Sequence, residues 1–116
     1  MTNEITAKIS GAVGLAARAR KCVTGTEICV EYMRAGKGKL LVIAQDISDN
    51  TRKKLVKTAV YHKIPYTEPN IDKSSLANSV GKKSDTSAVL LCDSGFVKII
   101  ENLGVKIHIT DTEVLL

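Results

Sequence analysis

The chain is poor in aromatic residues: its 116 residues include three Tyr, one Phe and no Trp. Proteins that bind single-stranded nucleic acid by stacking bases place several aromatic rings along the strand. The sequence therefore argues against a protein that reads nucleic acid by stacking bases on several rings.

Cysteine is also scarce, since the chain has three and no two of them form a CxxC pair. An odd number at these spacings matches neither a zinc site nor a disulfide framework. Cys22 and Cys92 lie in apolar runs, which predicts small buried hydrophobic side chains. Free cysteines are typical of a reducing compartment, so we expect a cytoplasmic protein.

Long hydrophobic runs are missing, and no stretch approaches the roughly 20 apolar residues that a membrane span needs. The N-terminus carries Glu4 and no long apolar run, which predicts no signal peptide. We find no internal repeat, low-complexity tract or linker. A chain of this length predicts one domain, residues 1–116, that is large enough to bury a core.

The net charge of +5 is unevenly spread along the chain. Residues 1–60 hold 11 basic and 5 acidic residues, a net charge of +6, whereas residues 61–116 hold 6 basic and 7 acidic residues, a net charge of −1. A basic half beside a near-neutral half indicates a face that binds a polyanion. A basic surface kept for solubility explains the same charge equally well.

Hydrophobic periodicity predicts alternating helices and short strands. The expected helices cover 4–18, from Thr24 or Gly25 to Gly36, 49–63, 72–80, and from Ser94 or Gly95 to Gly104. The expected strands cover 22–23, 40–44, 64–66, 88–92 and 106–109. Runs 40–44 and 88–92 are continuously apolar, as in central strands covered on both faces. The pattern predicts an α/β sandwich with helices on both faces of the sheet.

Capping residues and apolar stripes refine these expectations. Thr2 or Asn3 is a candidate cap for the first helix, Ser48 or Asp49 for the third and Asp72 for the fourth. In the second helix we expect Ile28, Tyr32 and Ala35 on one side. In the last helix we expect an apolar side made by Phe96, Ile99, Ile100 and Leu103.

Several motifs of catalytic or ligand sites fail on spacing. Gly36–Lys39 follows a helix and precedes a strand, the reverse of a phosphate-binding loop. The segment that starts at Asp46 lacks the glycine and glutamate of a calcium loop. His62 and His108 are far apart with no carboxylate or thiol beside them in sequence, and Asp85 and Asp93 are linked only by proximity in sequence. We therefore expect no catalytic site, no metal and no cofactor.

Basic residues cluster in two stretches. The run Arg52–Lys54, followed by Lys57, lies early in a predicted helix, where positive charge is unfavourable. A bound phosphate and a plain solvated helix face explain it equally well. The stretch 18–39 has six basic residues around Gly25 and only two acidic ones, Glu27 and Glu31.

Four segments in order resemble one family. They are GLAARARKCVTGTE (14–27), MRAGKGKLLVIAQDISDNTRKK (33–54), LANSVG (76–81) and DSGFVKII (93–100). They resemble bacterial YlxQ-like proteins of the ribosomal protein L-seven-Ae/L-thirty-e superfamily, and the resemblance extends over roughly residues 5–103, nearly the whole chain. The resemblance implies a three-layer α-β-α sandwich with a four-stranded mixed sheet. It also implies a ribosomal-protein-like, ribosome-associated RNA-binding module without catalysis, whose relatives bind kink-turn RNA.

The resemblance places the main RNA element at Gly25 and in the helix that follows it. The family carries polar or basic readers at the positions of Glu27, Ile28 and Glu31, so this chain departs from the pattern there. Glutamate at the position of Glu27 is shared with YlxQ-like relatives. A second contact is implied in the loop after Gly81, in the run Lys82–Asp85.

These considerations give one expected binding set and three hypotheses. The first hypothesis is a monomeric protein that binds structured RNA, ribosomal or regulatory, with no membrane partner. The second is a protein-interaction module of the same fold that has lost specific kink-turn recognition. The third, an enzyme that acts on an acidic small molecule, rests on positive charge alone. The expected RNA-binding residues are Arg18, Arg20, Lys21, Gly25, Thr26, Glu27, Ile28, Glu31, Arg34, Lys37, Lys39, Lys82, Lys83 and Ser84.

Overall fold

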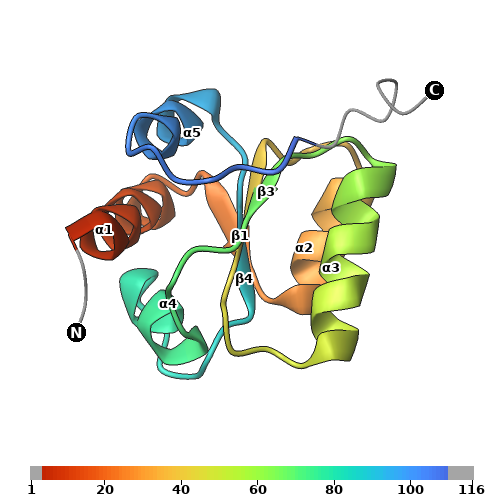
Figure 1. Ribbon diagram of the computed structural model, residues 1–116, viewed down its shortest axis with the longest axis horizontal. Coiled ribbons are helices and arrows are strands. Elements are labelled where there is room, and N and C mark those ends of the chain that lie inside the picture. Colours follow the sequence, from red (N-terminus) through yellow and green to blue (C-terminus); the bar gives the residue numbers. More distant parts are fainter. Residues whose placement is uncertain (1–3, 110–116) are drawn as a thin grey trace.

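A computed structural model of the chain describes residues 4–109. Helices and strands alternate along most of this part of the chain (Figure 1). Their order is α1 (Glu4–Arg18), β1 (Cys22–Thr24), α2 (Thr26–Arg34), β2 (Leu40–Ile43), α3 (Asp49–Tyr61), β3 (Tyr66–Thr67), α4 (Lys73–Ser79), β4 (Ala88–Leu91) and α5 (Ser94–Glu101).

The strands form one mixed sheet in the order β1-β4-β2-β3. Strand β4 is antiparallel to both of its neighbours, and β2 is parallel to β3. Leu91, the last residue of β4, lies opposite both Cys22 of β1 and Leu40 of β2. The sheet therefore has two distinct ends: β1 and β2 begin where β4 finishes, and they finish where β4 begins.

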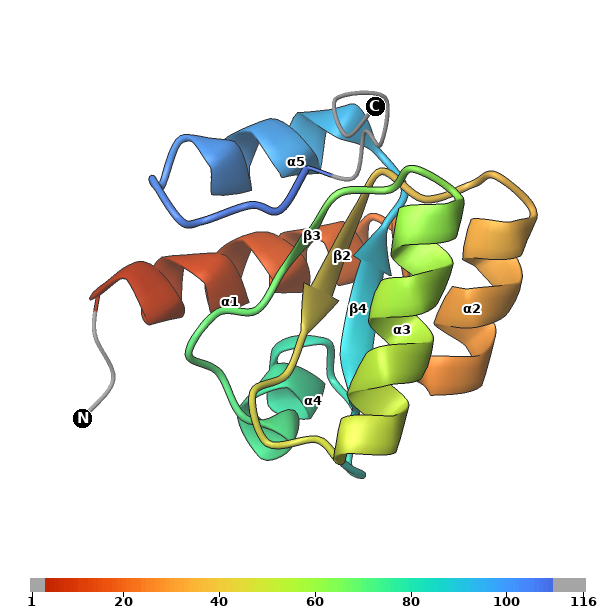
Figure 2. The same ribbon diagram turned by 45° about the vertical axis from the view of Figure 1, so that its right-hand side comes forward.

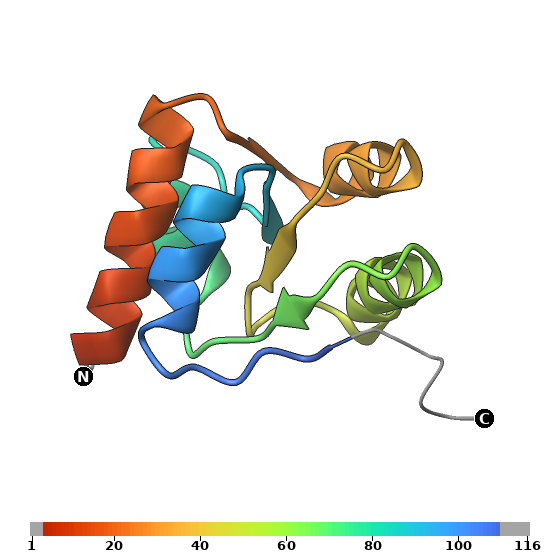
Figure 3. The same cartoon turned by 90° about the horizontal axis from the view of Figure 1, so that it is seen from above.

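Helices cover both faces of the sheet (Figures 1 and 3), with α1, α4 and α5 on one face and α2 and α3 on the other. Alternate residues of the central strands face opposite layers. Leu40 and Val42 pack with the first layer, whereas Leu41 and Ile43 pack with the second. Every residue of β2 and β4 is buried. The structure confirms the predicted three-layer α-β-α sandwich with a four-stranded mixed sheet.

Helix α2 has sharply defined ends. Gly25 precedes its first turn with φ 94° and ψ 154°, a backbone conformation that only glycine adopts readily. At the other end, Gly36 N–H donates to Met33 O at 3.0 Å and Lys37 N–H donates to Tyr32 O at 3.1 Å. This pair of bonds is the Schellman motif, in which Gly36 takes the left-handed position with φ 74°. The predicted helix end at Gly36 is confirmed.

The prediction for the apolar side of α2 is confirmed for Tyr32, which is half-buried against the core, and wrong for Ile28 and Ala35. The buried residues of the helix are Cys29, Val30 and Met33, whereas the Ile28 side chain is 49% exposed and Ala35 is exposed. The buried stripe is thus displaced around the helix from the expected one. Cys29, Val30 and Met33 form a compact apolar group at positions i, i+1 and i+4, which packs against Leu41 and Ile43.

Cysteine burial also differs from the prediction. Cys29 is fully buried, whereas Cys22 and Cys92 are only half-buried. Cys22 belongs to the edge strand β1, and Cys92 follows the last residue of β4. Both positions are covered less completely than the middle of α2.

Other boundaries shift by a few residues. The helix expected over 49–63 ends at Tyr61, and the strand expected over 64–66 is β3, Tyr66–Thr67. Pro65 has no backbone N–H to donate to a sheet, but its carbonyl accepts from Leu41 N–H at 3.0 Å. The edge strand expected over 106–109 is a single antiparallel bridge between His108 and Tyr66. The caps Ser48 and Asp72 are confirmed, whereas Thr2 and Asn3 lie outside the described residues.

Candidate nucleic-acid interface

The structure divides the expected binding residues between the two ends of the sheet. The stretch 18–39 is continuous in sequence, but β1 and α2 carry its parts to different places. Gly25 N–H donates to Ala88 O at 3.0 Å, at the start of β4, whereas Cys92 N–H donates to Lys21 O at 2.8 Å, just past its end. We call the first region the loop surface, made of Gly25–Ile28 and Lys82–Ser87. We call the second the lysine edge, made of Lys21, Lys37 and Lys39.

A side-chain hydrogen bond joins the two parts of the loop surface. The hydroxyl oxygens of Thr26 and Ser87 lie 2.6 Å apart. Thr26 is the first residue of α2, and Ser87 directly precedes β4. The residues are 61 positions apart in sequence. The structure thus brings together the glycine-started helix and the loop after Gly81 that the family resemblance implied.

The second loop is held at several points along its backbone. Lys82 N–H donates to Ala77 O at 2.9 Å at the end of α4, and Thr86 N–H donates to Lys73 O at 3.3 Å at its start. Ser87 O accepts from Ala44 N–H at 2.9 Å. Thr86 is 4% exposed, whereas Lys82, Lys83 and Ser84 are exposed. The loop therefore presents two lysines and a hydroxyl from a fixed backbone.

The start of α2 has no side-chain cap, because Gly25 occupies the cap position. The first amides of a helix have no partners within the helix, and the aligned peptide dipoles place partial positive charge there. The nine-residue helix α2 directs these amides toward the loop surface. Such a terminus favours an anionic group.

Glu27 is paired with a cation that the expected binding set did not include. Lys54 Nζ of α3 lies 2.9 Å and 2.7 Å from the two carboxylate oxygens of Glu27. Both side chains are substantially exposed, 44% for Lys54 and 77% for Glu27, so the pair stabilises the fold little. It does offset the negative charge of Glu27. The separation of 27 positions in sequence explains why no spacing rule pointed to Lys54.

Arg52, two residues before Lys54 on α3, also pairs with a carboxylate. Its guanidinium forms two hydrogen bonds with Glu68, one of them 2.7 Å from Nη2 to Oε2. This bidentate contact lowers the pKa of Glu68 below its ordinary value, although partial burial opposes the shift. Within residues 4–109, Arg52 and Lys54 of the basic run thus pair with Glu68 and Glu27, and Lys53 and Lys57 form no ion pair.

The lysine edge is organised differently from the loop surface. Lys39 N–H donates to Leu91 O at 2.8 Å, so Lys21 and Lys39 flank the end of β4. Lys37 Nζ lies 5.4 Å from the centroid of the Tyr32 ring, within the range of a cation–π contact. Burial raises the pKa of the Cys92 thiol, and the Lys37 ammonium opposes that rise.

The remaining expected residues lie outside both regions or beside them. Arg18, at the end of α1, lines a small cavity together with Gly81, so it lies next to the loop surface. Arg20 directly precedes Lys21 of the lysine edge. Arg34 lines a groove between α2 and α3. Glu31 is exposed on α2 and forms no ion pair in the described part of the chain.

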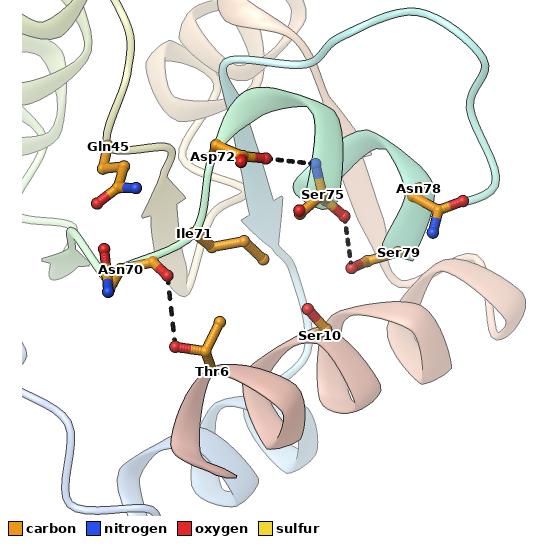
Figure 4. A pocket seen from close by; sticks show the side chains of 9 residues that line it. All are labelled: Thr6, Ser10, Gln45, Asn70, Ile71, Asp72, Ser75, Asn78 and Ser79. Carbon is orange, nitrogen blue, oxygen red and sulfur yellow. Dashed lines mark hydrogen bonds between the residues drawn. The ribbon is translucent and has the colours of Figure 1, made fainter. Parts of the chain in front are cut away.

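A separate polar cavity of about 480 Å³ lies between α1, α4 and the segment that precedes α4 (Figure 4). Thr6 and Ser10 line it from α1, and Ser75 and Ser79 line it from α4. Asp72 is the only charged lining residue, and its carboxylate accepts from Ser75 N–H at 2.7 Å. Because that carboxylate already caps α4, the cavity presents mainly neutral hydroxyl and amide groups.

Residues 4–109 contain no group of three or more His, Cys, Asp and Glu side chains arranged to hold a metal ion. None of the helices in this part of the chain has the length and apolar character needed to cross a membrane.

The fold and the loop surface define an α-β-α sandwich protein with a hydrogen-bonded surface that carries two exposed lysines at one end of its sheet. The sequence pattern of the ribosomal protein L7Ae/L30e/S12e/Gadd45 family matches residues 7–101. The chain belongs to this family.

Individual relatives agree with this assignment. The chain is 34% identical over 91 residues to the RNA-binding protein YlxQ of Bacillus subtilis (strain 168), covering 78% of this chain and 89% of the relative. It is 31% identical over 96 residues to the RNA-binding protein YlxQ of Enterococcus faecium, covering 83% and 90%.

Solved structures share the fold. A protein of unknown function from Bacillus halodurans C superposes with a TM-score of 0.76 at 30% identity, covering 84% of this chain and 96% of that one. The 15.5kD RNA binding protein of Giardia lamblia gives a TM-score of 0.72 at 16% identity, covering 89% and 87%. At that identity, the second likeness shows the fold alone.

Proposed function

We propose that this chain is an RNA-binding protein that holds a sharply bent, kink-turn-like RNA on its loop surface. One observation carries the proposal: the 2.6 Å Thr26–Ser87 hydrogen bond unites the uncapped start of α2 with the loop that bears Lys82 and Lys83. These are the two segments in which the family resemblance implies RNA contacts. The YlxQ relatives, named as RNA-binding proteins, support the same function.

The loop surface offers complementary groups for an RNA backbone. The amides at the start of α2 and the lysines at positions 82 and 83 bind phosphates. The hydroxyls of Thr26 and Ser84 and the carboxylate of Glu27 face sugars or base edges, since a carboxylate accepts from base amino groups. Lys54 offsets the charge of Glu27, which reduces the repulsion that a bare carboxylate exerts on phosphates.

The other expected cations act at longer range in this proposal. Arg18 extends the loop surface past Gly81, and Arg34 extends it along α2. Arg20 and the lysine edge raise the positive potential that steers an RNA toward the protein. We further propose that residues 1–116 act as one monomeric domain on a structured RNA such as those of the ribosome.

Binding to a kink-turn RNA and to a hairpin of equal length, measured at increasing salt, tests the proposal. We expect both affinities to fall steeply with salt because bound phosphates release counterions. We expect the kink-turn to bind at least about tenfold more tightly, a difference of about 1.4 kcal/mol. Undetectable binding to both RNAs at low salt contradicts RNA binding, and equal affinities contradict kink-turn recognition.

A second candidate function rests on Ile28. This side chain is 49% exposed on the same helix as two acidic residues, Glu27 and Glu31. An exposed aliphatic side chain can make no hydrogen bond to RNA, whereas a protein partner can bury it. The second candidate is therefore a protein-interaction module of the same fold that has lost specific kink-turn recognition.

The variant with Ile28→Gln and Glu31→Lys separates the two candidates. It restores a polar and a basic side chain at positions where the resemblance implies RNA readers. A large gain in kink-turn affinity supports the protein-interaction module. Loss of an existing RNA affinity shows instead that the native residues take part in RNA recognition.

A further inference from the structure

Helices α2 and α3 lie side by side and run in the same direction (Figure 2). A groove lies between them. The groove has a volume of about 510 Å³. It is lined by the last residue of α2 and by residues of the 54–62 segment, along and just past α3. Its lining residues are Arg34, Lys54, Lys57, Thr58, Tyr61 and His62.

Three cations line this α2–α3 groove. Lys54, Lys57 and Tyr61 stand at positions i, i+3 and i+7 of α3, so they form one stripe along it. Arg34 faces the stripe from α2. Neither Arg34 nor Lys57 forms an ion pair with any residue that the structure describes. The acidic residues nearby are Glu27, which pairs with Lys54, and Glu31, which is exposed on α2, so positive charge dominates at the Arg34 end.

Tyr61 gives the same end of the groove an open aromatic ring. Its side chain is 81% exposed, the largest exposed fraction among the exposed large hydrophobic residues of the described chain. The His62 ring packs edge-on against it, with the centroids 5.0 Å apart and an interplanar angle of 77°. That contact fixes the orientation of the Tyr61 ring while most of its surface remains in solvent.

An aromatic ring beside two unpaired cations fits one class of ligand. A single-stranded nucleic acid offers unpaired bases that stack on such rings and phosphates that bind such cations. A duplex keeps its bases paired and stacked on one another, so it offers no free base face to the Tyr61 ring. The combination at Arg34, Lys57 and Tyr61 therefore favours a single strand.

The groove is also continuous with the loop surface. Lys54 lines the groove and at the same time pairs with Glu27 of the loop surface. From Lys54 to Tyr61 the stripe extends about 10 Å along α3, which suits a few nucleotides.

We propose that the α2–α3 groove binds a short single-stranded extension of the RNA whose folded part lies on the loop surface. Phosphates of the extension contact Arg34 and Lys57, and one base stacks on Tyr61. This inference rests on the proposed RNA-binding function and adds a second site to it.

The test uses a kink-turn RNA and two extended forms, which carry a short unpaired oligoadenosine at the 5′ or the 3′ end. We expect one extended form to bind the wild-type protein at least about fivefold more tightly than the unextended RNA, because stacking of one base contributes that much or more. Tyr61→Ala should abolish the gain, and Tyr61→Phe, which keeps the ring, should retain it.

Two further variants control the measurement. Ile99→Ala truncates an exposed side chain of α5, which lies on the opposite face of the sheet from Tyr61. This variant should keep the full gain in affinity for the extended RNA. Lys57→Gln, which lies outside the expected RNA-binding set, should lower the slope of log affinity against log salt for the extended RNA by up to about 0.7 and leave that of the unextended RNA unchanged.

The outcomes separate this inference from the proposed function. If the wild-type protein binds the unextended kink-turn but neither extension adds affinity, the groove proposal is overturned alone, as expected if the groove serves a protein partner. Retention of the full gain by Tyr61→Ala overturns it as well. If no RNA binds at low salt, both the proposed function and this inference are overturned.

Discussion

The two ends of the sheet differ both in charge and in construction: the loop surface holds Lys82 and Lys83 together with Glu27 and Asp85, whereas the lysine edge holds three lysines and no acid. At the loop surface, a side-chain hydrogen bond joins two separate segments, and three backbone bonds hold the second segment to its neighbours. At the lysine edge, Lys37 lies over the Tyr32 ring and beside Cys92, and no second loop joins the three lysines in the part of the chain that the structure describes. Charge alone favours the lysine edge, whereas preorganised polar groups favour the loop surface. We therefore expect the loop surface to recognise RNA and the lysine edge to contribute mainly attraction.

The largest expected difference concerns the thiols at the two ends. Burial raises the pKa of the Cys29 thiol, under the first turns of α2, to about 12. Cys92, near the lysine edge, is half-buried. Alkylation requires the thiolate, and at about pH 8 only roughly one Cys29 side chain in ten thousand is ionised. Cys29 should react at least about 100-fold more slowly than Cys92.

Peptide mass spectrometry after timed treatment with iodoacetamide measures these rates. Raising the pH should accelerate labelling of all three cysteines and preserve their order while the fold persists. Unfolding the protein should make the rates similar. Equal rates at Cys29 and Cys92 in the native protein would contradict a tightly packed start of α2.

The glycines at the two ends of α2 provide the next comparison. Gly25→Ala forces a side chain into the conformation with φ 94° and ψ 154°, which costs about 1–3 kcal/mol or displaces the start of the helix. Gly36→Ala adds about 1–2 kcal/mol of left-handed strain at the other end. Both variants should unfold at lower temperature, but only Gly25→Ala should weaken kink-turn binding, by at least about tenfold.

Thermal unfolding and RNA titration of the two variants, below both melting transitions, check this prediction. Neither added methyl group meets a neighbouring atom within 4 Å, so backbone conformation is the main variable. Equal losses of RNA affinity would mean that general destabilisation, rather than the loop surface, governs binding.

Two double variants, which each remove two positive charges, compare the two ends of the sheet. Lys82→Gln with Lys83→Gln should lower kink-turn affinity several-fold and reduce the slope of log affinity against log salt by about 1 to 2, because each lost phosphate contact removes up to about 0.9. Lys37→Gln with Lys39→Gln should change the slope by less than about 0.5. The same reduction for both pairs would show that the protein binds RNA through diffuse charge.

The smallest expected effect concerns the bond between the two segments of the loop surface. Thr26→Val and Ser87→Ala each remove one partner of the 2.6 Å hydrogen bond. A double-mutant cycle by urea unfolding should give a coupling of about 0.5–1.5 kcal/mol. Thr58→Val, which removes a hydroxyl bonded to Lys54 O within α3, should show no coupling to Ser87→Ala. A coupling of zero between Thr26 and Ser87 would show that this hydrogen bond does not stabilise the contact between the two segments.

Much of the fold follows from the sequence because its local signals are strong. Helix α1, the caps Ser48 and Asp72, and the two buried strands follow from periodicity and capping chemistry. Errors arise where tertiary packing decides between local alternatives. Ile28 and Cys29 are adjacent apolar residues of α2, and only the packing of the helix on β2 and β4 selects Cys29 for the core.

The candidate site could be predicted only in part. Gly25, Lys82 and Lys83 follow from family resemblance and turn chemistry, but sequence order suggested one basic stretch from Arg18 to Lys39. The three-residue strand β1, about 10 Å long, carries the middle of this stretch, at Gly25, away from Lys21 and Lys39, which lie together at the other end of the sheet. Contacts between distant residues, such as Glu27 with Lys54, leave no periodic signal in a single sequence.

Amide chemical-shift mapping during titration with a kink-turn RNA tests the central claim most directly. The account predicts that the largest shifts fall on Gly25, Thr26 and the 82–87 segment, and that the amides of Lys21, Lys37 and Lys39 shift little. The largest shifts at the lysine edge, with an unperturbed loop surface, would contradict it.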